Sequence, residues 1–450
     1  MARLFGTDGV RGVANRDLTP LLAMQLGMAA ATVLGNGNHA PHVLVGRDTR
    51  LSGDMLEAAL VAGLCAAGAR VTLLGILPTP AVAYCTKNSQ ADAGAVISAS
   101  HNPFEDNGIK FFSVDGCKLP DRIEDEIESL VRDWEHIPRA QGEHIGSVQR
   151  DSEWIDHYVA HLIASTGCSL KGMRIVVDAA NGAAYSIAPR VLSQLGAEVV
   201  PIHCTPDGIN INAGCGSLHT QSMRRTVKEQ RADAGLSFDG DADRVIMSDE
   251  HGNEVDGDCI MAMSAIYLKE AGRLRNNVLV ATIMSNLGLE EAMSKHGIRL
   301  ERTRVGDRYV AERMRELDAV LGGEQSGHII FAEYTTTGDG LLTALQVLAL
   351  MQRTGKTLSD LAKVMTRYPQ MIRNVRVRDK HAWERYEGAK GIEVGVLQQL
   401  GSPSRVNIRP SGTEPVVRIM LEATDRARME QVIAQLEQTV LKVCGEPQRS

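Results

Sequence analysis

Residues 98–103, with the sequence SASHNP, place two small hydroxyl side chains directly after a short apolar run. The apolar run, residues 94–97, has the length of a buried strand, and Asn102 with Pro103 ends it. The ends of such strands carry the chemistry in α/β folds, so Ser100 is the candidate nucleophile. The local alternative is that Asn102 caps a short helix beginning at Pro103, which would make Ser100 an ordinary loop hydroxyl.

Three carboxylates, Asp239, Asp241 and Asp243, alternate with other residues at the end of a second apolar run. Carboxylates this close repel one another unless a cation neutralises them, and hard oxygen ligands suit Mg²⁺ or Ca²⁺. An EF-hand is the competing interpretation, because Glu250 falls at its twelfth position. However, its sixth position is Arg244 rather than glycine, and both flanks resemble strands. We therefore predict a divalent-metal site here, with a solvated acidic turn as the alternative.

A third polar loop, residues 409–415 (RPSGTEP), combines a guanidinium, two hydroxyls and a glycine, and a further arginine lies on the strand that follows. These groups suit a phosphate, although the chain contains no G-x-x-x-x-G-K-[ST] motif. The alternative is a plain hairpin turn. The predicted phosphate contacts are Arg409, Ser411, Gly412, Thr413 and Arg418.

A fourth loop, residues 322–328 (GGEQSGH), gathers donors and acceptors that suit sugar hydroxyls, carried by Glu324, Ser326 and His328. By itself this signal is weak. Near the N-terminus, the glycines of residues 5–12 (FGTDGVRG) allow backbone amides to approach an anion, and Arg11 adds a forked cation.

Two further side chains are candidates for proton transfer because they lie near the nucleophile in the sequence. They are His101 and Lys110, and a lone histidine is more often structural than catalytic.

The elements that must position these loops alternate between strands and helices. Strands at 42–46, 70–74 and 94–97, with a return at 108–112, alternate with helices at 18–33, 52–67 and 80–86. The pattern then recurs twice, and each copy has its polar motif between a third strand and its return. The recurring strands are expected at 173–178, 198–203, 234–238 and 245–247, and then at 277–280, 299–302, 319–321 and 329–331.

The last part of the chain departs from this pattern. It predicts strands at 375–377, 405–408 and 416–422 and a terminal helix from about 425 to 443. The expected fold is therefore α/β, with three consecutive mixed-sheet domains of similar topology and a C-terminal α+β domain around a central cleft. We place the domains at 1–150, 151–256, 257–368 and 369–450, because residues 141–150 lose periodicity and gain charge.

Size and composition fit a globular protein of several domains. The chain has 450 residues, 44% of them hydrophobic, and a formal net charge of −7, which argues against a nucleic-acid coat. Its eight cysteines show no C-x-x-C pair and no zinc spacing, which suits reduced thiols. The N-terminus lacks the apolar core of a signal peptide and no stretch approaches transmembrane length, so we expect a cytoplasmic protein.

Together, the motifs FGTDGVRG, SASHNP, DGDADR, GGEQSGH and RPSGTEP resemble those of the α-D-phosphohexomutase superfamily, and most closely its phosphoglucosamine mutase branch. The resemblance covers essentially the whole chain. It implies that Ser100 is carried as a phosphoserine and that Asp239, Asp241 and Asp243 hold Mg²⁺ against its phosphate. It also implies that Glu324 and Ser326, with His328 and Arg244, contact the sugar, and that the Arg409 loop binds the distal phosphate.

The activity implied by this resemblance is the interconversion of glucosamine 6-phosphate and glucosamine 1-phosphate through glucosamine 1,6-bisphosphate, in the synthesis of UDP-N-acetylglucosamine and cell-wall precursors. A hexose 1,6-bisphosphate is the expected activator. The expected partner is a small sugar phosphate, without nucleic acid or membrane, and a homodimer is the assembly considered. The alternatives are a phosphomannomutase or phosphoglucomutase of the same superfamily, a metal-dependent phosphatase and a catalytically silent sugar-phosphate sensor.

Overall fold

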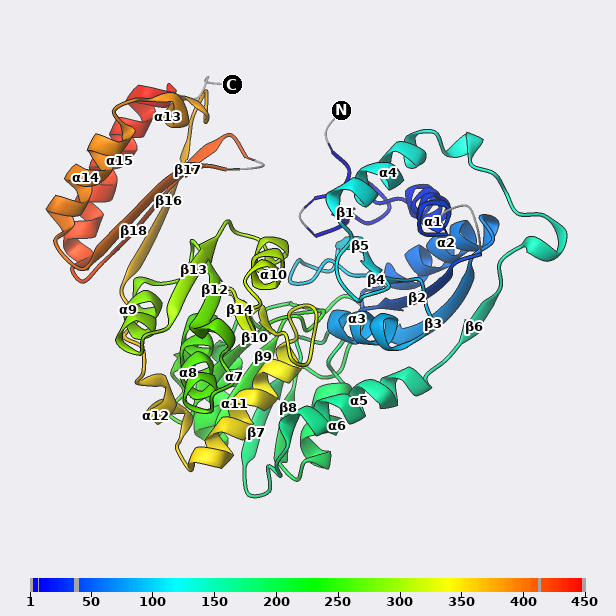
Figure 1. Ribbon diagram of the computed structural model, residues 1–450, viewed down its shortest axis with the longest axis horizontal. Coiled ribbons are helices and arrows are strands. Elements are labelled where there is room, and N and C mark those ends of the chain that lie inside the picture. The colour runs from blue at the N-terminus through cyan, green and yellow to red at the C-terminus, as the bar shows by residue number, and fades with distance from the viewer. Residues whose placement is uncertain (1–2, 7, 36–39, 412–413, 447–450) are drawn as a thin grey trace. The chain divides into compact units, whose positions relative to one another are not determined.

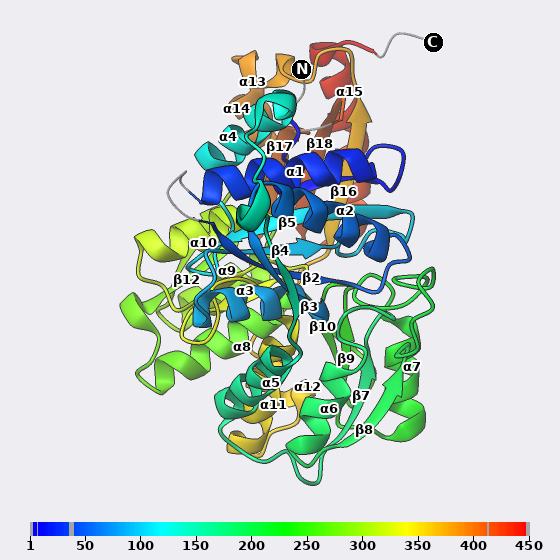
Figure 2. The ribbon, with the colours of Figure 1, turned by 90° about the vertical axis from the view of Figure 1, so that its right-hand side faces the viewer.

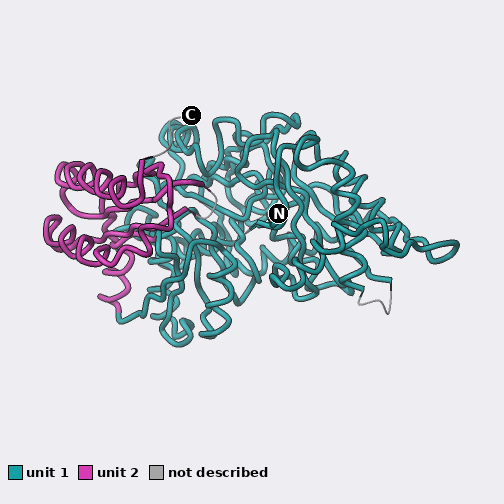
Figure 3. Tube along the Cα trace, turned by 90° about the horizontal axis from the view of Figure 1, so that it is seen from above, with its two compact units in different colours: residues 1–284, 297–364 teal, residues 285–296, 365–450 magenta. Residues whose placement is uncertain are grey.

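The computed structural model describes residues 3–6, 8–35, 40–411 and 414–446. Contacts along the chain divide it into two compact units (Figure 3). Unit 1 comprises residues 1–284 and 297–364, and unit 2 comprises residues 285–296 and 365–450.

The first sheet of unit 1 follows the N-terminal part of the chain, and its strands run in the order β1-β5-β4-β2-β3-β6. The strands are β1 (Val10–Val13), β2 (His42–Arg47), β3 (Arg70–Ile76), β4 (Ala93–Ile97), β5 (Asp106–Ser113) and β6 (Val148–Arg150). The helices are α1 (Pro20–Leu34), α2 (Gly53–Ala66), α3 (Thr79–Asn88) and α4 (Asp121–Arg132). Helices α1 and α2 cover one face of this sheet and α3 the other (Figures 1 and 2). Thr19 caps α1 by accepting from the Leu22 amide, with Pro20 at the first helical position.

The second sheet has the order β11-β10-β9-β7-β8. Its strands are β7 (Arg174–Asp178), β8 (Glu198–Ile202), β9 (Ala234–Phe238), β10 (Val245–Asp249) and β11 (Glu254–Val255). The helices of this part are α5 (Glu153–Thr166), α6 (Ile187–Gln194) and α7 (Gln221–Gln230). Helix α7 closes one face with Met223 and Val227, which pack on Val176 of the central strand.

The third sheet has the order β13-β12-β14-β15. Its strands are β12 (Val278–Thr282), β13 (Arg299–Thr303), β14 (Leu321–Gly323) and β15 (Ile329–Phe331). The helices of this part are α8 (Gly257–Glu270), α10 (Asp307–Glu316), α11 (Gly340–Thr354) and α12 (Leu358–Ala362). Val310 and Met314 of α10 pack on Val278 and Val280 of the sheet.

One arrangement recurs in all three sheets. The orders β3-β2-β4-β5, β8-β7-β9-β10 and β13-β12-β14-β15 correspond strand for strand. In each, the first three strands are parallel and the fourth returns antiparallel. The three similar α/β units predicted from the sequence are confirmed, and each polar motif lies between the third strand and its return.

Two local predictions in unit 1 are wrong, and one local alternative is excluded. The strand predicted at 319–321 lies at Leu321–Gly323, where Gly322 pairs with Val280 of β12 and with Ile330 of β15. The alternative helix at Pro103 does not form, and residues 99–105 make turns. Val148–Arg150, expected to be irregular, pairs with β3 as an edge strand.

Unit 2 contains an antiparallel sheet in the order β16-β18-β17. Its elements are α9 (Leu287–Lys295), β16 (Gln370–Arg376), α13 (Ala382–Arg385), α14 (Ala389–Leu400), β17 (Ser404–Pro410), β18 (Val416–Ala423) and α15 (Arg426–Cys444). The sheet buries Val417, Ile419 and Leu421 against α15, which Asp425 caps by accepting from the Arg428 amide. Among the described residues, no helix has both the length and the apolar character needed to span a membrane.

Candidate active site

Ser100 lies in the loop between β4 and β5, fully buried and with a positive φ of 53°. Its Oγ donates to Asp239 Oδ2 at 2.6 Å, which joins the loop of the first sheet to the loop of the second. Its amide donates to Ser98 Oγ at 3.0 Å, and that hydroxyl donates to Asp48 Oδ2 at 2.6 Å. A non-glycine residue in the left-handed region is uncommon and persists where the surroundings hold it, so this serine is positioned by its neighbours.

Arg50 supplies much of that support from the end of β2. Its side chain is fully buried, and Nε donates to Asp48 Oδ2 at 2.9 Å. Its terminal nitrogens donate to the backbone carbonyls of Ser100, Asn102, Pro103 and Asp106. The planar guanidinium with its fixed donors suits such a task, which a lysine cannot reproduce.

The second sheet holds the same loop from the other side. Asn212 Nδ2 donates to the carbonyls of Ser100 at 2.9 Å and of Asn102 at 3.0 Å. Gly240 approaches so closely that a Cβ there would lie 2.6 Å from Ser100 O. The DGDADR turn therefore needs a glycine at this position to bring its carboxylates to the serine.

The carboxylates of Asp239, Asp241 and Asp243 (the Asp trio) lie within 4.8 Å of one another, and all three residues are buried. Asp241 Oδ2 accepts from Lys110 Nζ at 2.8 Å and from Thr79 Oγ1 at 2.7 Å. Among the described residues, the Oδ1 atoms of Asp241 and Asp243 have no hydrogen-bond partner. Burial and the neighbouring Asp243 and Asp241 carboxylates raise the pKa of Asp239 well above its usual value.

These properties fit a divalent cation. A buried acceptor without a donor is costly, and the two neighbouring carboxylates disfavour the charged form of Asp239, so added positive charge would be stabilising here. An all-oxygen set of this kind suits a hard ion such as Mg²⁺. The predicted metal-ligating residues are thus brought together, with Ser100 beside them.

Cationic side chains connect this cluster to the N-terminal loop and to the third sheet. Lys110 pairs with Asp241 and, at 3.1 Å, with Asp8. Lys118 forms ion pairs with Asp8 and with Asp307 at the start of α10. Although burial lowers the pKa of Lys110, Asp241 and Asp8 raise it more, so the ammonium remains charged at neutral pH.

The sugar-contact candidates surround the third motif. Glu324 and Ser326 are half-buried, and Ser326 Oγ donates to Glu324 Oε2 at 3.5 Å. His328 is buried, and its Nε2 accepts from the Gly338 amide at 3.0 Å, which places the proton of the neutral ring on Nδ1, 3.4 Å from Asp243 Oδ2. His328 therefore supports the Asp trio as well as the sugar-contact loop.

Three other predicted residues flank the serine. Arg11 pairs with Asp8. His101 Nδ1 lies 3.4 Å from Ser100 Oγ, and burial together with Arg244 and Arg11 lowers the pKa of this histidine to about 4. The amide of Arg244 donates to Asp239 Oδ1 at 3.1 Å.

A cavity of about 590 Å³ opens beside this cluster. Lys118 and Pro120 line it from the first part of the chain, and Asp307, His328 and Thr336 line it from the third. Its size is in the range of small-molecule sites, and His328 lines both this cavity and the charged cluster.

Unit 2 carries the fourth predicted motif. Arg409 on β17 lies directly opposite Arg418 on β18, and burial together with Arg418 lowers the pKa of Arg409. Ser411 is buried, and its carbonyl accepts from Lys380 Nζ at 2.6 Å. The remaining predicted contacts, Gly412 and Thr413, lie outside the described residues.

The sequence interpretation missed several groups that hold the candidate site. They are Asp8, Asp48, Arg50, Lys118, Asn212, Asp307 and Lys380. Asp48 and Arg50 directly follow a buried strand, which was a usable signal. Lys118 and Asp307 had no comparable signal, because their ion pair joins positions 189 residues apart.

Four domain profiles of one family match the chain in succession. Their descriptions are phosphoglucomutase/phosphomannomutase alpha/beta/alpha domains I, II and III and C-terminal domain, at residues 2–137, 152–252, 256–368 and 373–439. Our own domain limits stay a prediction.

Curated relatives match over nearly the whole chain. A phosphoglucosamine mutase of Desulforamulus reducens is 51% identical over 98% of this chain and 99% of its own length. One of Moorella thermoacetica is 53% identical over 97% of this chain and 99% of its own.

Solved structures share the fold. A phosphoglucomutase/phosphomannomutase family protein of Burkholderia thailandensis has a TM-score of 0.84 at 24% identity, covering 99% of each chain. An N-acetylphosphoglucosamine mutase of Aspergillus fumigatus, solved with GlcNAc-6P and magnesium, has a TM-score of 0.71 at 17% identity, covering 98% of this chain and 96% of its own. With the repeated sheets, the buried serine and the Asp trio, these matches show that the chain belongs to the α-D-phosphohexomutase superfamily and, within it, to the phosphoglucosamine mutase family.

Proposed function

We propose that the protein is an isomerase that interconverts glucosamine 6-phosphate and glucosamine 1-phosphate, with Ser100 as the phosphate carrier. One observation supports this above the others. A buried serine at a positive φ lies 2.6 Å from a carboxylate of a cluster whose Asp241 and Asp243 each have an oxygen without a donor. Phosphoryl transfer needs this combination of a fixed nucleophile and a place for neutralising charge.

Mg²⁺ is the proposed resident ion, held by Asp239, Asp241 and Asp243. When bound, it neutralises charge on the phosphoryl group that is transferred. The chain contributes the rest of the positive field through Lys110, which Asp241 and Asp8 keep charged, and through Arg244 beside the trio.

In the first half of the proposed reaction, a free sugar hydroxyl attacks the phosphorus of phosphoserine 100. The bond from phosphorus to Oγ breaks, a bond to the sugar oxygen forms, and glucosamine 1,6-bisphosphate results. The hydroxyl proton passes to a basic side chain, and Oγ takes up a proton. Asp239, which accepts from the Ser100 hydroxyl, would hold the unphosphorylated serine between the two half-reactions.

The second half needs the bisphosphate to turn end for end, because C1 and C6 cannot both meet Ser100 in one pose. Glu324 and Ser326 are proposed to contact the sugar hydroxyls in both poses. The loop of Arg409, Ser411 and Arg418, with Gly412 and Thr413 by sequence, is proposed to bind the phosphate that is not reacting.

His101 and Lys110 remain the two candidates for the proton transfer. His101 is neutral at physiological pH and adjoins Oγ, whereas Lys110 keeps its proton while both of its carboxylate partners are charged. The pH dependence of kcat in His101→Gln and Lys110→Arg separates the two. Only the variant that lacks the proton acceptor should lose the fall in kcat at low pH, since that fall comes from protonation of the acceptor.

The central test is whether Ser100 is required for turnover and carries a phosphate. Ser100→Ala should lose at least about 10⁴-fold in kcat, and wild-type protein treated with hexose 1,6-bisphosphate should carry a phosphate on Ser100, seen by mass spectrometry of its peptides. Ser89→Ala, at the end of α3, is the matched control and should retain activity. Substantial turnover by the Ser100 variant, or a phosphate only on another residue, would overturn the proposal.

The substrate is tested by a coupled assay on glucosamine, mannose and glucose 6-phosphates. We expect the highest kcat/KM with glucosamine 6-phosphate. An equal or higher value with mannose or glucose 6-phosphate would make the protein a phosphomannomutase or phosphoglucomutase of the same superfamily.

A further inference from the structure

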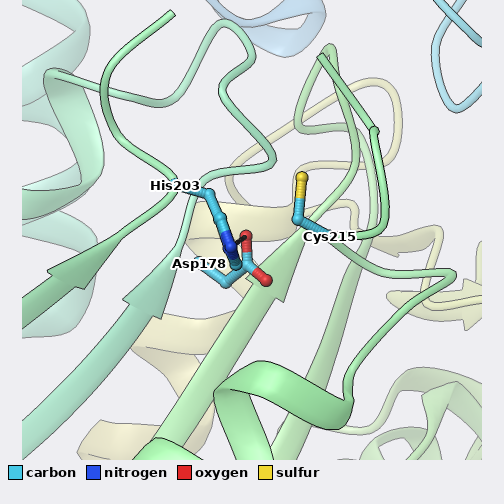
Figure 4. Close-up of side chains that lie close together, drawn as sticks. All are labelled: Asp178, His203 and Cys215. Atoms are coloured by element: carbon cyan, nitrogen blue, oxygen red, sulfur yellow. Dashed lines mark ion pairs between the residues drawn. The ribbon is translucent and has the colours of Figure 1, made fainter. Parts of the chain in front are cut away.

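A second group of side chains able to bind a metal lies at the end of β7 and in the loop that follows β8. Asp178, His203 and Cys215 each bring one ligand atom, and these atoms all lie within 4.8 Å of one another (Figure 4). Asp178 ends β7, which pairs with β9, the strand that leads into the trio. Unlike the trio, this group offers one oxygen, one nitrogen and one sulfur.

Asp178 is held in place by the backbone. It is fully buried, and its carboxylate accepts from the amides of Ala180 at 2.9 Å and Gly216 at 3.0 Å. Each carboxylate oxygen can accept more than one bond, so both keep capacity toward His203 and Cys215. A ligand oriented by other hydrogen bonds is typical of protein metal sites.

His203 and Cys215 approach the carboxylate from two ends of one loop. His203 follows β8, and its Nδ1 lies 3.2 Å from Asp178 Oδ1. Cys215 is buried and carries a free thiol. Figure 4 shows the imidazole facing the carboxylate and the Cys215 side chain next to them, with its sulfur turned away from the carboxylate in this view. The His203 side chain is 32% exposed, which leaves room for a water ligand on that side.

We propose that Asp178, His203 and Cys215 bind a divalent transition-metal ion such as Zn²⁺, with an open fourth position. Ligand atoms around tetrahedral zinc lie about 3.3–3.6 Å apart, given bonds of about 2.0–2.3 Å. Asp178 Oδ1 and His203 Nδ1, 3.2 Å apart, are already close to this separation, and the thiol, which lies within 4.8 Å of the other two ligand atoms, has to approach by at most about 1.5 Å.

The ligand types separate this site from the Asp trio. Imidazole and thiolate favour Zn²⁺ or Co²⁺, whereas three carboxylates favour Mg²⁺. Excess Mg²⁺ therefore saturates the trio without competing for a site that contains a thiolate.

An ion bound by His203 and Cys215 would affect the Ser100 loop, because the segment between these two residues contacts it. Asn212 in this loop donates to Ser100 O, and Gly208 O accepts from the Leu51 amide at 2.8 Å. An ion that joins both ends of the loop to β7 reduces the freedom of a segment that holds the Ser100 loop.

The test is a Co²⁺ titration of the full chain in excess Mg²⁺. Wild-type protein should develop the near-ultraviolet charge-transfer band of a cobalt–thiolate bond. Cys215→Ser should lose that band, and His203→Gln should weaken Co²⁺ binding by about 10-fold to 100-fold or more. Asp178 is left unchanged, because its backbone contacts make its variants prone to misfold.

Two controls make the assignment specific. Cys204→Ser removes a neighbouring thiol, which donates to Ile202 O at 3.3 Å, and should keep the band. Asp241→Asn disables the trio and should also keep it. A band that survives Cys215→Ser, or Co²⁺ binding without any thiolate band, would overturn the proposal.

Hydrogen exchange supplies a second measurement that does not depend on the cobalt–thiolate absorption band. Zn²⁺ should slow exchange of the amides between residues 203 and 216 in wild-type protein and leave their rates unchanged in Cys215→Ser. Equal slowing in both proteins contradicts the site.

Discussion

Like charges lie side by side in two places, once in each unit, and the two places differ in exposure. The Asp trio is 0–4% exposed and is surrounded by Lys110, Thr79 and His328. The paired arginines of unit 2 are more open, since the Arg418 side chain is 38% exposed and reaches Glu414 at 3.0 Å.

This difference determines what each place can do. Buried repulsion is barely screened, so the trio should hold its cation firmly through many cycles. Repulsion between Arg409 and Arg418 is screened by water, and an anion there gains charge-assisted bonds without being trapped. In the proposed reaction the ion stays while the phosphate binds and leaves, which matches the two environments.

The largest effect on activity is expected when one charge is removed from the buried Asp trio. Asp241→Asn should lower kcat by about 10³-fold or more, because neutralisation of the transferred group depends on the full trio. The coupled assay at saturating Mg²⁺ measures the loss, and thermal unfolding checks the fold. Glu229→Gln, an exposed carboxylate on α7, is the control. Near-normal activity of Asp241→Asn, or of wild-type protein in EDTA, contradicts the prediction.

A smaller effect on activity is expected when a charge is removed from the more exposed arginine pair of unit 2. Arg418→Ala should raise KM by about 10-fold to 100-fold, since it removes charge-assisted contacts to the phosphate. It should also let more bisphosphate escape, so that turnover depends more on added hexose 1,6-bisphosphate. Arg426→Ala, at the exposed start of α15, is the control. An unchanged KM would place the phosphate elsewhere.

The smallest effect on turnover is expected at a buried carboxylate outside the Asp trio, that of Asp339. Asp339 accepts from the Leu342 amide and from Tyr158 Oη, each at 2.9 Å, and burial raises its pKa to about 6. The fold favours the protonated form, so this group's contribution to stability is complete below its unfolded pKa of 3.8 and is lost as the pH rises through about 6.

Asp339→Asn removes the charge, with its Oδ1 able to accept from the Leu342 amide and its Nδ2 able to donate to Tyr158 Oη. Its Tm relative to wild type should therefore rise between pH about 4 and about 7, by the equivalent of at most about 3 kcal/mol, with kcat little changed. Calorimetry at several pH values measures this, with Asp156→Asn, an exposed carboxylate of α5, as the control. A Tm difference that is constant with pH would show that Asp339 is not protonated by burial.

The repeated fold could be predicted because each copy shows the same local signal. Buried strands such as Ala93–Ile97 and Ala234–Phe238 are short and mostly apolar, and the polar loop that follows each one is equally visible. Ser100 and the Asp trio could be proposed as site residues for that reason, because each motif lies within a few neighbouring residues of the sequence.

What could not be predicted depends on contacts between distant residues. Helix α9 groups with the C-terminal part through Asn286, whose amide donates to Tyr368 O at 2.9 Å, and no periodicity indicates this. Cys215 and His203 likewise have no motif spacing, since Asp178 belongs to another strand. Local patterns carry no information about such pairs, which only the fold brings together.

The buried Arg50 restricts the movement of the Ser100 loop during the proposed reaction. Its side chain donates to the carbonyls of Ser100, Asn102, Pro103 and Asp106. Because these hydrogen bonds fix the Ser100 loop, it cannot move from one end of a substrate to the other. In the proposed route the sugar therefore has to reorient. Each time it turns it can diffuse away, which leaves Ser100 without its phosphate. In the proposed route, a rigid nucleophile would thus make turnover depend on bisphosphate supplied from outside.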